Sequence, residues 1–339
     1  MLRLPPFRYI APASVDEAAR ILSEHGPEAT VVAGGTDLYP NMKRRQMTPS
    51  LLVGLRGLRN LRGIRGDKES GIAIGAGTTL TEINEDPRIQ EMYPALAKAA
   101  GWVSTPQLRN MGTIGGNICL DTRCNYYNQS YFWRKAIGFC MKKDGDICLV
   151  APGSPRCWAI SSSDTVPVLM SLGATVSLRS VREERQIPVA SLFQDDGIVY
   201  LTKAPDEILL SVSLPPVNGL KSTYWKLRRR GSFDFPVLGV AAALSLDESG
   251  NCDDARLVLG AVGSEPHVIK AAKEMLLGQK LTPEIIESVA EVASKPSRPL
   301  DNSDLDHGYR KRMTRVFVTR ALRELAGLPI PRMGAPYDL

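Results

Sequence analysis

The sequence lacks the features expected of a membrane, secreted or nucleic-acid-binding protein. No run of about 18 apolar residues occurs, so no membrane-spanning helix is predicted. Pro5 and Pro6 interrupt the stretch where a secretory signal peptide needs its apolar segment, so we expect a cytoplasmic protein. Although the net charge is +6, the positive residues are scattered apart from one cluster at residues 226–230. Scattered charge is typical of a solvated surface, and nucleic acid is therefore not an expected partner.

The sequence also lacks the arrangements by which a single chain carries out acid–base chemistry or binds a nucleotide by a common fingerprint. It has three histidines, and no Ser–His–Asp grouping or pair of catalytic carboxylates is apparent. Neither the Gly-x-Gly-x-x-Gly fingerprint nor a Walker lysine is present. We predict no catalytic residues in this chain, and any redox chemistry has to come from bound cofactors.

The composition and the hydrophobic pattern predict a folded α+β protein. Hydrophobic residues make up 43% of the sequence and charged residues 23%, as in ordinary globular proteins. A capping-box pattern at Ser14 and Glu17 predicts a helix, and Asp164 is expected to cap another. Residues 218–339 predict three strands and then three helices, which indicates a separate α+β unit. Strands are predicted at residues 29–33, 51–55, 72–75, 174–178, 208–214, 222–227, 238–245 and 255–262, and helices at 93–100, 268–277, 282–293 and 309–325.

Two glycine-rich segments have the composition needed to approach a phosphate group. They are Val31-Val-Ala-Gly-Gly-Thr-Asp-Leu38 and Asn110-Met-Gly-Thr-Ile-Gly-Gly-Asn117. Glycine permits close backbone approach and positive φ angles, so that successive N–H groups can surround an anion. Each segment alone is equally compatible with an ordinary tight turn. Two of them in one domain favour a dinucleotide, which needs contacts at both ends.

Five of the six cysteines lie within 39 residues, which suggests a metal site. Cys124, Cys140, Cys148 and Cys157 have the spacing Cys-x15-Cys-x7-Cys-x8-Cys in an irregular stretch, residues 120–158. Four thiolates can enclose zinc or ligate a [4Fe–4S] cluster. Zinc sites usually pair cysteines about two to four residues apart, so the wide spacing favours a cluster. Unligated core thiols remain the alternative. Cys252 is expected in a turn without a role.

The two glycine-rich segments resemble the FAD loops of the molybdenum hydroxylase flavoproteins, which include the medium subunit of carbon monoxide dehydrogenase and the FAD region of xanthine dehydrogenase. The resemblance covers essentially the whole chain. It implies an α+β fold with a two-part FAD-binding domain of the vanillyl-alcohol-oxidase (PCMH) type, followed by a smaller α+β C-terminal domain. The implied boundaries are 1–60 and 61–217 for the two FAD-binding subdomains and 218–339 for the C-terminal domain. Further matching positions are Ser163, Asp164, residues 207–215, Lys226, residues 228–230, residues 299–301, Tyr309 and Arg310.

Residues 120–158 depart from this family pattern. Most members run almost directly from the second glycine-rich segment to the Ser-Asp segment, whereas here a cysteine-bearing insertion intervenes. The insertion resembles the β subunit of 4-hydroxybenzoyl-CoA reductase, which is distinguished by an extra [4Fe–4S] cluster. The resemblance therefore implies that the cluster ligands are Cys124, Cys140, Cys148 and Cys157.

The resemblance also implies roles for the FAD-binding residues. The glycine-rich segments would hold the pyrophosphate, Asp164 would bind the adenosine end, and Lys226 would lie near the flavin ring. The implied FAD-binding residues are Val31, Val32, Ala33, Gly34, Gly35, Thr36, Asp37, Leu38, Asn110, Thr113, Gly116, Asn117, Asp164 and Lys226.

The implied function is electron transfer within a larger enzyme that reductively removes the hydroxyl group of an aromatic acyl-CoA. The implied partners are a large subunit with the molybdenum cofactor, a small [2Fe–2S] subunit and ferredoxin as electron donor, in an (αβγ)2 assembly. Two alternatives stay open. One is the FAD subunit of an ordinary xanthine- or purine-type hydroxylase that oxidises its substrate. The other is a non-enzymatic, zinc-stabilised nucleotide-binding module.

Overall fold

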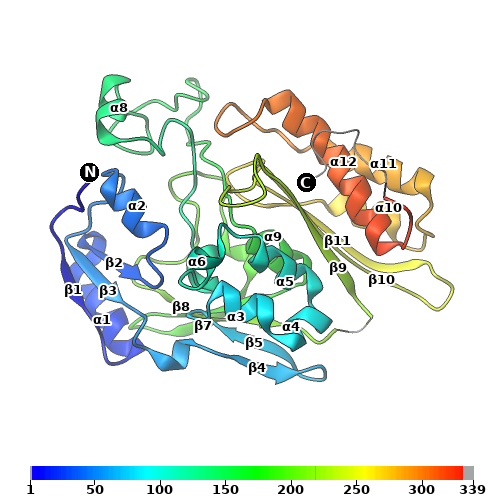
Figure 1. Cartoon of the computed structure of the whole chain (residues 1–339), viewed down its shortest axis with the longest axis horizontal. Coiled ribbons are helices and arrows are strands. Elements are labelled where there is room, and N and C mark those ends of the chain that lie inside the picture. The colour runs from blue at the N-terminus through cyan, green and yellow to red at the C-terminus, as the bar shows by residue number, and fades with distance from the viewer. Residues whose placement is uncertain (1, 218, 331–339) are drawn as a thin grey trace.

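The structure, a computed structural model, describes residues 2–217 and 219–330. Its strands form three sheets, which lie side by side in chain order (Figure 1). The strands are β1 (Arg8–Ile10), β2 (Ala29–Val32), β3 (Leu51–Gly54), β4 (Ile64–Asp67), β5 (Gly71–Gly75), β6 (Thr175–Arg179), β7 (Glu184–Pro188), β8 (Ile208–Leu214), β9 (Lys221–Leu227), β10 (Leu238–Leu246), β11 (Cys252–Gly260) and β12 (His267–Val268). The α-helices are α1 (Val15–His25), α2 (Leu38–Lys43), α3 (Leu80–Glu85), α4 (Pro87–Met92), α5 (Pro94–Gly101), α6 (Pro106–Arg109), α7 (Ile114–Ile118), α8 (Tyr131–Ala136), α9 (Thr165–Ser171), α10 (Lys270–Leu276), α11 (Pro283–Ser294) and α12 (His307–Leu325).

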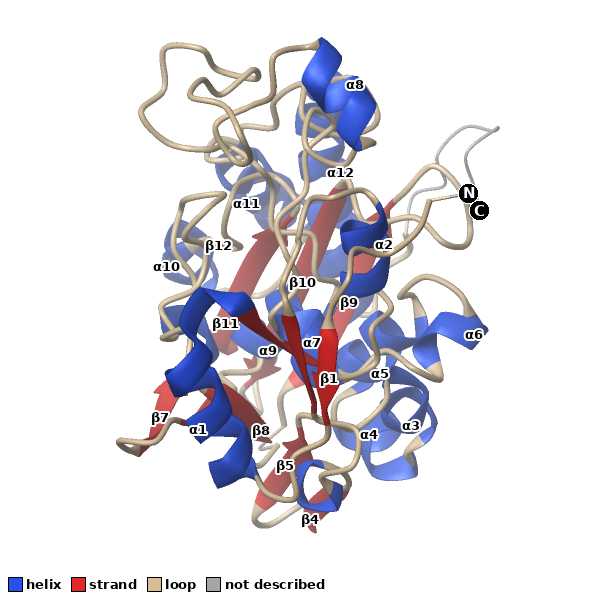
Figure 2. Cartoon of the chain, turned by 90° about the vertical axis from the view of Figure 1, so that its left-hand side faces the viewer, coloured by secondary structure: helices blue, strands red, loops and turns tan. Residues whose placement is uncertain are grey.

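The first sheet consists of three short parallel strands in the order β1-β3-β2. Parallel neighbours need a crossover connection, and α2 lies in the one between β2 and β3. Helix α1 connects β1 to the non-adjacent strand β2 and packs Ala18 and Leu22 against the sheet (Figure 2). Ser14 caps α1 as predicted, because its hydroxyl accepts from the Glu17 amide at 3.1 Å. The reciprocal half of the predicted capping box is not formed, since the Glu17 carboxylate accepts from the Ala13 amide instead.

The second sheet is antiparallel, with the order β4-β5-β8-β6-β7. Its central strand β8 follows the cysteine-bearing insertion in the chain. It pairs with β5, which precedes the insertion. Helices α3, α5 and α9 bury their apolar side chains against this sheet. Strand β7 was not predicted, because its residues alternate between exposed and half-buried and carry no apolar stripe strong enough to show in the sequence.

The third sheet has the order β12-β11-β10-β9, and one of its strands is buried on both faces. Along β10, Ala241 and Ala243 point into the core of the second sheet, whereas Val240, Ala242 and Leu244 point into the core of the C-terminal helices. Successive side chains of a strand face opposite sides, so β10 contributes side chains to both hydrophobic cores. The small alanine side chains allow both cores to pack closely against the strand.

The described structure corrects three further local predictions. The helix expected at 268–277 is present as α10 but begins at Lys270, after strand β12. Cys252 is buried at the start of β11 rather than standing in a turn. Asp164 precedes α9 but its side chain makes no capping hydrogen bond, because it is engaged in an ion pair elsewhere. None of the described helices is long and apolar enough to cross a membrane.

The insertion at 120–158 is irregular as predicted, apart from the short helix α8. It is attached to the end of α2 by Arg134, whose fully buried guanidinium donates to the carbonyl oxygens of Arg44 at 3.3 Å and Arg45 at 2.9 Å. The Gln46 side chain donates in turn to the Tyr127 carbonyl oxygen. These contacts position the insertion next to the segment that follows the first glycine-rich loop (Figure 1).

Substitution of Arg310 tests the packing of the C-terminal unit. This fully buried side chain donates to the carbonyl oxygens of Val237, Leu300 and Ala261 at 3.0, 3.0 and 2.8 Å. A buried acceptor that loses its donor costs about 1–3 kcal/mol, so Arg310→Met is expected to lower the free energy of unfolding by at least about 3 kcal/mol. Urea denaturation measures the change. Exposed Arg312 on the same helix is the control, and an equal loss in Arg312→Met would contradict the explanation.

Candidate functional site

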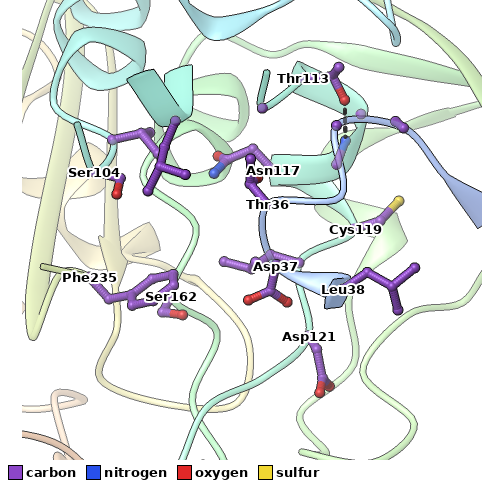
Figure 3. Close-up of a pocket in the computed structure, with 18 of the residues that line it drawn as sticks. Thr36, Asp37, Leu38, Ser104, Thr113, Asn117, Cys119, Asp121, Ser162 and Phe235 are labelled. Carbon is purple, nitrogen blue, oxygen red and sulfur yellow. Dashed lines mark hydrogen bonds between the residues drawn. The ribbon is translucent and has the colours of Figure 1, made fainter. Parts of the chain in front are cut away.

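A pocket of about 670 Å³ lies where the first sheet, the second sheet and the C-terminal unit meet. Its volume falls in the range of about 300–1,000 Å³ that is usual for cofactor and ligand pockets. Both glycine-rich segments contribute to its wall (Figure 3). Of the residues predicted to bind FAD, the following line it: Val31, Val32, Ala33, Gly34, Gly35, Thr36, Asp37, Leu38, Asn110, Thr113, Gly116, Asn117 and Asp164.

The two glycine-rich segments are in direct backbone contact. A Cβ atom at Gly34 would lie 1.9 Å from the carbonyl oxygen of Met111, so no larger residue fits there without separating the segments. At Gly35 the φ angle is +71°, which side chains with a Cβ rarely adopt. Glycine is thus required at both positions for the segments to form one continuous wall, which the sequence did not reveal.

Asn117 links the second glycine-rich segment to the segment before α9. Its Oδ1 atom accepts from the hydroxyls of Ser163 and Thr165, each at 2.7 Å. Nearby, the Thr113 hydroxyl accepts from the Gly116 amide at 3.1 Å. The predicted FAD-binding residues of this segment are therefore held in place by hydrogen bonds within the protein.

Asp164 and Lys226 form a buried ion pair behind the pocket wall. The Lys226 Nζ atom lies 2.9 Å from Asp164 Oδ2 and donates to the Trp102 carbonyl oxygen at 3.0 Å, while the Tyr224 hydroxyl donates to Asp164 Oδ1 at 2.9 Å. Burial raises the pKa of Asp164 against the opposing charge of Lys226, and burial lowers the pKa of Lys226. Asp164 lines the pocket and Lys226 does not. A role of Lys226 beside the flavin ring stays a prediction.

Two pocket residues that sequence reasoning missed have buried polar atoms without a partner among residues 2–217 and 219–330. These atoms are Ser162 Oγ and Asn302 Oδ1. An unpaired buried polar atom costs about 1–3 kcal/mol, so both atoms favour a ligand with polar groups. The run of serines before Asp164 was a usable signal for Ser162. No sequence signal identified Asn302, because it joins the pocket from a distant segment.

Arg123 joins three parts of the pocket wall. Its guanidinium lies 3.3 Å from Asp37 Oδ1 and stacks on the Phe235 ring at 3.9 Å from the ring centre. Burial raises the pKa of Asp37, and the Arg123 charge opposes this rise. The pocket therefore brings together the first glycine-rich segment, the insertion and the C-terminal unit, and its buried polar groups suit an elongated, polar cofactor.

The four predicted cluster ligands border a second, smaller cavity of about 10 Å³. All four thiols are buried, and burial raises the pKa of Cys124 to about 12 and that of Cys157 to about 11. Within the described part of the chain, no group of three or more His, Cys, Asp or Glu side chains is arranged to hold a single metal ion. The thiols are therefore gathered around one space without converging on one point, and Cys124 also lines the larger pocket.

Comparison with known families identifies the cofactor of this chain. Residues 5–217 match the family described as the FAD binding domain in molybdopterin dehydrogenase, and residues 222–325 match the CO dehydrogenase flavoprotein C-terminal domain. The chain belongs to the FAD-binding medium subunits of the molybdenum hydroxylase family. It is therefore an oxidoreductase subunit whose cofactor is FAD, with the predicted fold of an FAD-binding domain followed by an α+β domain.

Relatives and solved structures agree with this membership. The chain is 28% identical over 322 residues, 95% of each chain, to the 6-hydroxypseudooxynicotine dehydrogenase complex subunit alpha of Paenarthrobacter nicotinovorans. It is 31% identical over 290 residues, 84% of each chain, to the nicotinate dehydrogenase FAD-subunit of Eubacterium barkeri. A carbon monoxide dehydrogenase structure from Hydrogenophaga pseudoflava matches with a TM-score of 0.78 and 27% identity, over 95% of this chain and 97% of the other.

These comparisons bear differently on the three functions that the sequence left open. The named relatives are dehydrogenases, which favours the FAD subunit of a substrate-oxidising enzyme over the reductive 4-hydroxybenzoyl-CoA reductase interpretation. The non-enzymatic, zinc-stabilised alternative receives no support from them. The predicted [4Fe–4S] cluster is not part of the family match.

Enlarging Gly34 tests whether contact between the two glycine-rich segments is needed for FAD. Gly34→Ala places a methyl group against the Met111 carbonyl and is expected to separate the segments. Because about 1.4 kcal/mol already changes affinity tenfold, the dissociation constant for FAD should rise at least roughly tenfold, as measured by flavin fluorescence titration. Gly57→Ala, whose Cβ meets open space, is the control. Unchanged FAD affinity in Gly34→Ala would contradict the assignment.

Lys226→Met tests the buried ion pair. Removing one partner of such a pair costs about 3–5 kcal/mol, so urea denaturation should show a loss of that size, whereas Lys221→Met at an exposed position of β9 should cost less than about 0.5 kcal/mol.

The folded-state pKa of Asp164 is raised, so folding binds a proton and stability falls as pH rises toward that pKa. Without Lys226 this pKa rises further, and the fall in stability should extend to higher pH than in the wild type.

The double variant Lys226→Met/Asp164→Asn completes the test. It removes both charges together, so its loss of stability should be smaller than the sum of the two single losses. Simple additivity of the two single variants would show that the pair does not interact.

Proposed function

We propose that this chain transfers electrons through FAD within a molybdenum-containing complex. The observation that carries the proposal is the larger pocket, which is walled by two touching glycine-rich segments; we assign it to FAD and call it the FAD pocket. Substrate would bind on a large subunit with the molybdenum cofactor, and a small [2Fe–2S] subunit would connect it to FAD. We also propose an (αβγ)2 assembly, which the sequence resemblance to the molybdenum hydroxylase family implies.

The direction of electron flow separates two candidate functions. The names of the relatives, nicotinate and carbon monoxide dehydrogenases among them, support a complex that oxidises its substrate and delivers electrons through FAD to an external acceptor. This is the better supported candidate. It requires FAD in this chain and does not require a further redox group.

The cysteine cavity supports the second candidate, a 4-hydroxybenzoyl-CoA reductase-like complex. There, electrons from ferredoxin would enter at a [4Fe–4S] cluster, pass to FAD and continue through [2Fe–2S] to molybdenum. Four cysteines that are widely spaced in the sequence border one cavity, and its other wall residues, apart from Ala159, belong to the same insertion.

The four thiols suit a [4Fe–4S] cluster in chemistry more than in present spacing. A cluster takes four cysteine thiolates, and four cysteines with no histidine border the cavity. The space between them is about 10 Å³, close to the volume of one water probe. When bound, the cluster would supply one-electron transfer, and Cys124 would connect it to the FAD pocket.

Cofactor content of the full chain, purified without oxygen, tests both parts of the proposal. The reductase-like candidate predicts about one FAD with four iron and four sulfide per chain, whereas the substrate-oxidising candidate requires FAD alone. If the cluster is present, its content should respond to one cysteine. Cys148→Ser should lose iron and sulfide while keeping FAD, because Cys148 lines the small cavity and not the FAD pocket. Cys252→Ser is the matched control, since this thiol is equally buried but lies at the start of β11.

Each outcome of the measurement separates the candidates. FAD without iron would exclude the cluster and leave the substrate-oxidising candidate. FAD with iron that is lost in Cys148→Ser would favour the reductase-like candidate. A chain without FAD would contradict the electron-transfer function altogether.

A further inference from the structure

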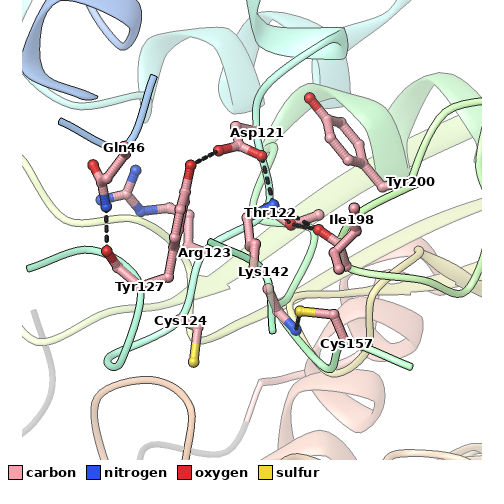
Figure 4. A network of polar contacts seen from close by, with 12 residues as sticks. Gln46, Asp121, Thr122, Arg123, Cys124, Tyr127, Lys142, Cys157, Ile198 and Tyr200 are labelled. Atoms are coloured by element: carbon pink, nitrogen blue, oxygen red, sulfur yellow. Dashed lines mark hydrogen bonds and ion pairs between the residues drawn. The ribbon is translucent and has the colours of Figure 1, made fainter. Parts of the chain in front are cut away.

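The FAD pocket and the cysteine cavity are joined by a buried ion pair as well as by Cys124. Asp121 lines the FAD pocket and Lys142 lines the cysteine cavity, and their Oδ1 and Nζ atoms lie 2.8 Å apart (Figure 4). Both side chains are 6% exposed. We refer to these two residues as the Lys142–Asp121 bridge.

The ammonium group of Lys142 is held in one position. It donates to Asp121 Oδ1 at 2.8 Å, to the Thr122 hydroxyl at 2.7 Å and to the Gly197 carbonyl oxygen at 2.6 Å. A lysine ammonium has three N–H donors, so every donor is used. The rings of Tyr127 and Tyr200 lie beside it, with centres 4.8 and 5.5 Å from Nζ. The positive charge is therefore fixed and shielded from water, and it lies at the wall of the cavity that the four cysteines border.

Asp121 is held equally firmly from the other side. Its Oδ2 atom accepts from the Tyr127 hydroxyl at 2.9 Å, and Tyr127 also lines the cysteine cavity. From the cysteine cavity to the first glycine-rich segment, charges of alternating sign follow one another on Lys142, Asp121, Arg123 and Asp37. A buried ion pair costs about as much in desolvation as it returns, so stability alone is a weak reason for placing one between two cofactor sites.

We propose that Lys142 is a positioning residue that raises the reduction potential of the group bound by the four cysteines, and that Asp121 limits this effect. The inference rests on the [4Fe–4S] cluster proposed above. Reduction adds one electron from an external donor to the cluster, forms and breaks no bond, and makes the cluster more negative. A fixed cation nearby stabilises the reduced state more than the oxidised state, and the effect is strong where water is excluded. The carboxylate of Asp121 acts with the opposite sign.

Redox titration followed by electron paramagnetic resonance, on the full chain purified without oxygen, tests the inference. Lys142→Met is expected to lower the midpoint potential by at least a tenfold change in the reduction equilibrium, about 59 mV for one electron. Asp121→Asn is expected to raise it, because the charge of Lys142 is then uncompensated. Lys142→Arg retains the charge and should titrate close to the wild type.

Lys143→Met is the matched control for charge removal. Lys143 is the next residue, its side chain is 34% exposed, and it pairs with Asp144 at 3.3 Å on the surface. Solvent screens its charge, so the potential should not move. Iron, sulfide and FAD content are measured in every variant so that potentials are compared only between loaded proteins.

The opposite shifts of Lys142→Met and Asp121→Asn form a signature that a purely structural role does not produce. Wild-type potentials in both variants, with full iron and FAD content, would overturn the inference and leave the cluster in place. If Lys142→Met loses its iron, Asp121→Asn decides, and a potential at or below that of the wild type overturns the inference. A wild-type chain without iron would instead overturn the cluster proposal on which the inference rests.

Discussion

Close contact between two backbone segments is the constraint on which the proposed FAD site depends. Gly34 and the Met111 carbonyl approach so closely that a single added carbon would collide, and this contact joins the first sheet to the segment that precedes α7. The two segments thereby form one continuous part of the pocket wall. The hydrogen bonds of Asn117 then attach the same wall to α9.

A second constraint keeps the C-terminal unit against this wall. Strand β10 faces two hydrophobic cores, and its alanines allow the helices of the second sheet to pack closely. The same packing brings Lys226 of β9 behind Asp164, and the loop after β9 carries Phe235 onto Arg123. The FAD pocket is therefore a product of the contact between units rather than a property of any one of them.

The cysteine-bearing insertion adds a second, smaller cavity beside the FAD pocket. Arg134 attaches it to the end of α2, and Cys124 stands where its cavity and the FAD pocket share a wall. An irregular segment suits this task, because widely spaced thiols can converge only if the chain between them is free to turn. Lys142 lies buried between the two cavities, and its ammonium group uses all three donors in hydrogen bonds. The boundary between the cavities is therefore held in a defined geometry.

The sequence by itself determined the α+β class, most of the strands and helices, both glycine-rich segments and the gathering of four cysteines in one insertion. These features are local, because hydrophobic period, glycine content and residue spacing act between near neighbours in the chain. Tertiary structure alone decided that Asp164 pairs with Lys226 instead of capping α9, that Asn302 enters the FAD pocket, and that Lys142 meets Asp121 between the two cavities. Such partners are far apart in sequence or come from irregular loops, and only the packing of the sheets against one another brings them within hydrogen-bonding distance.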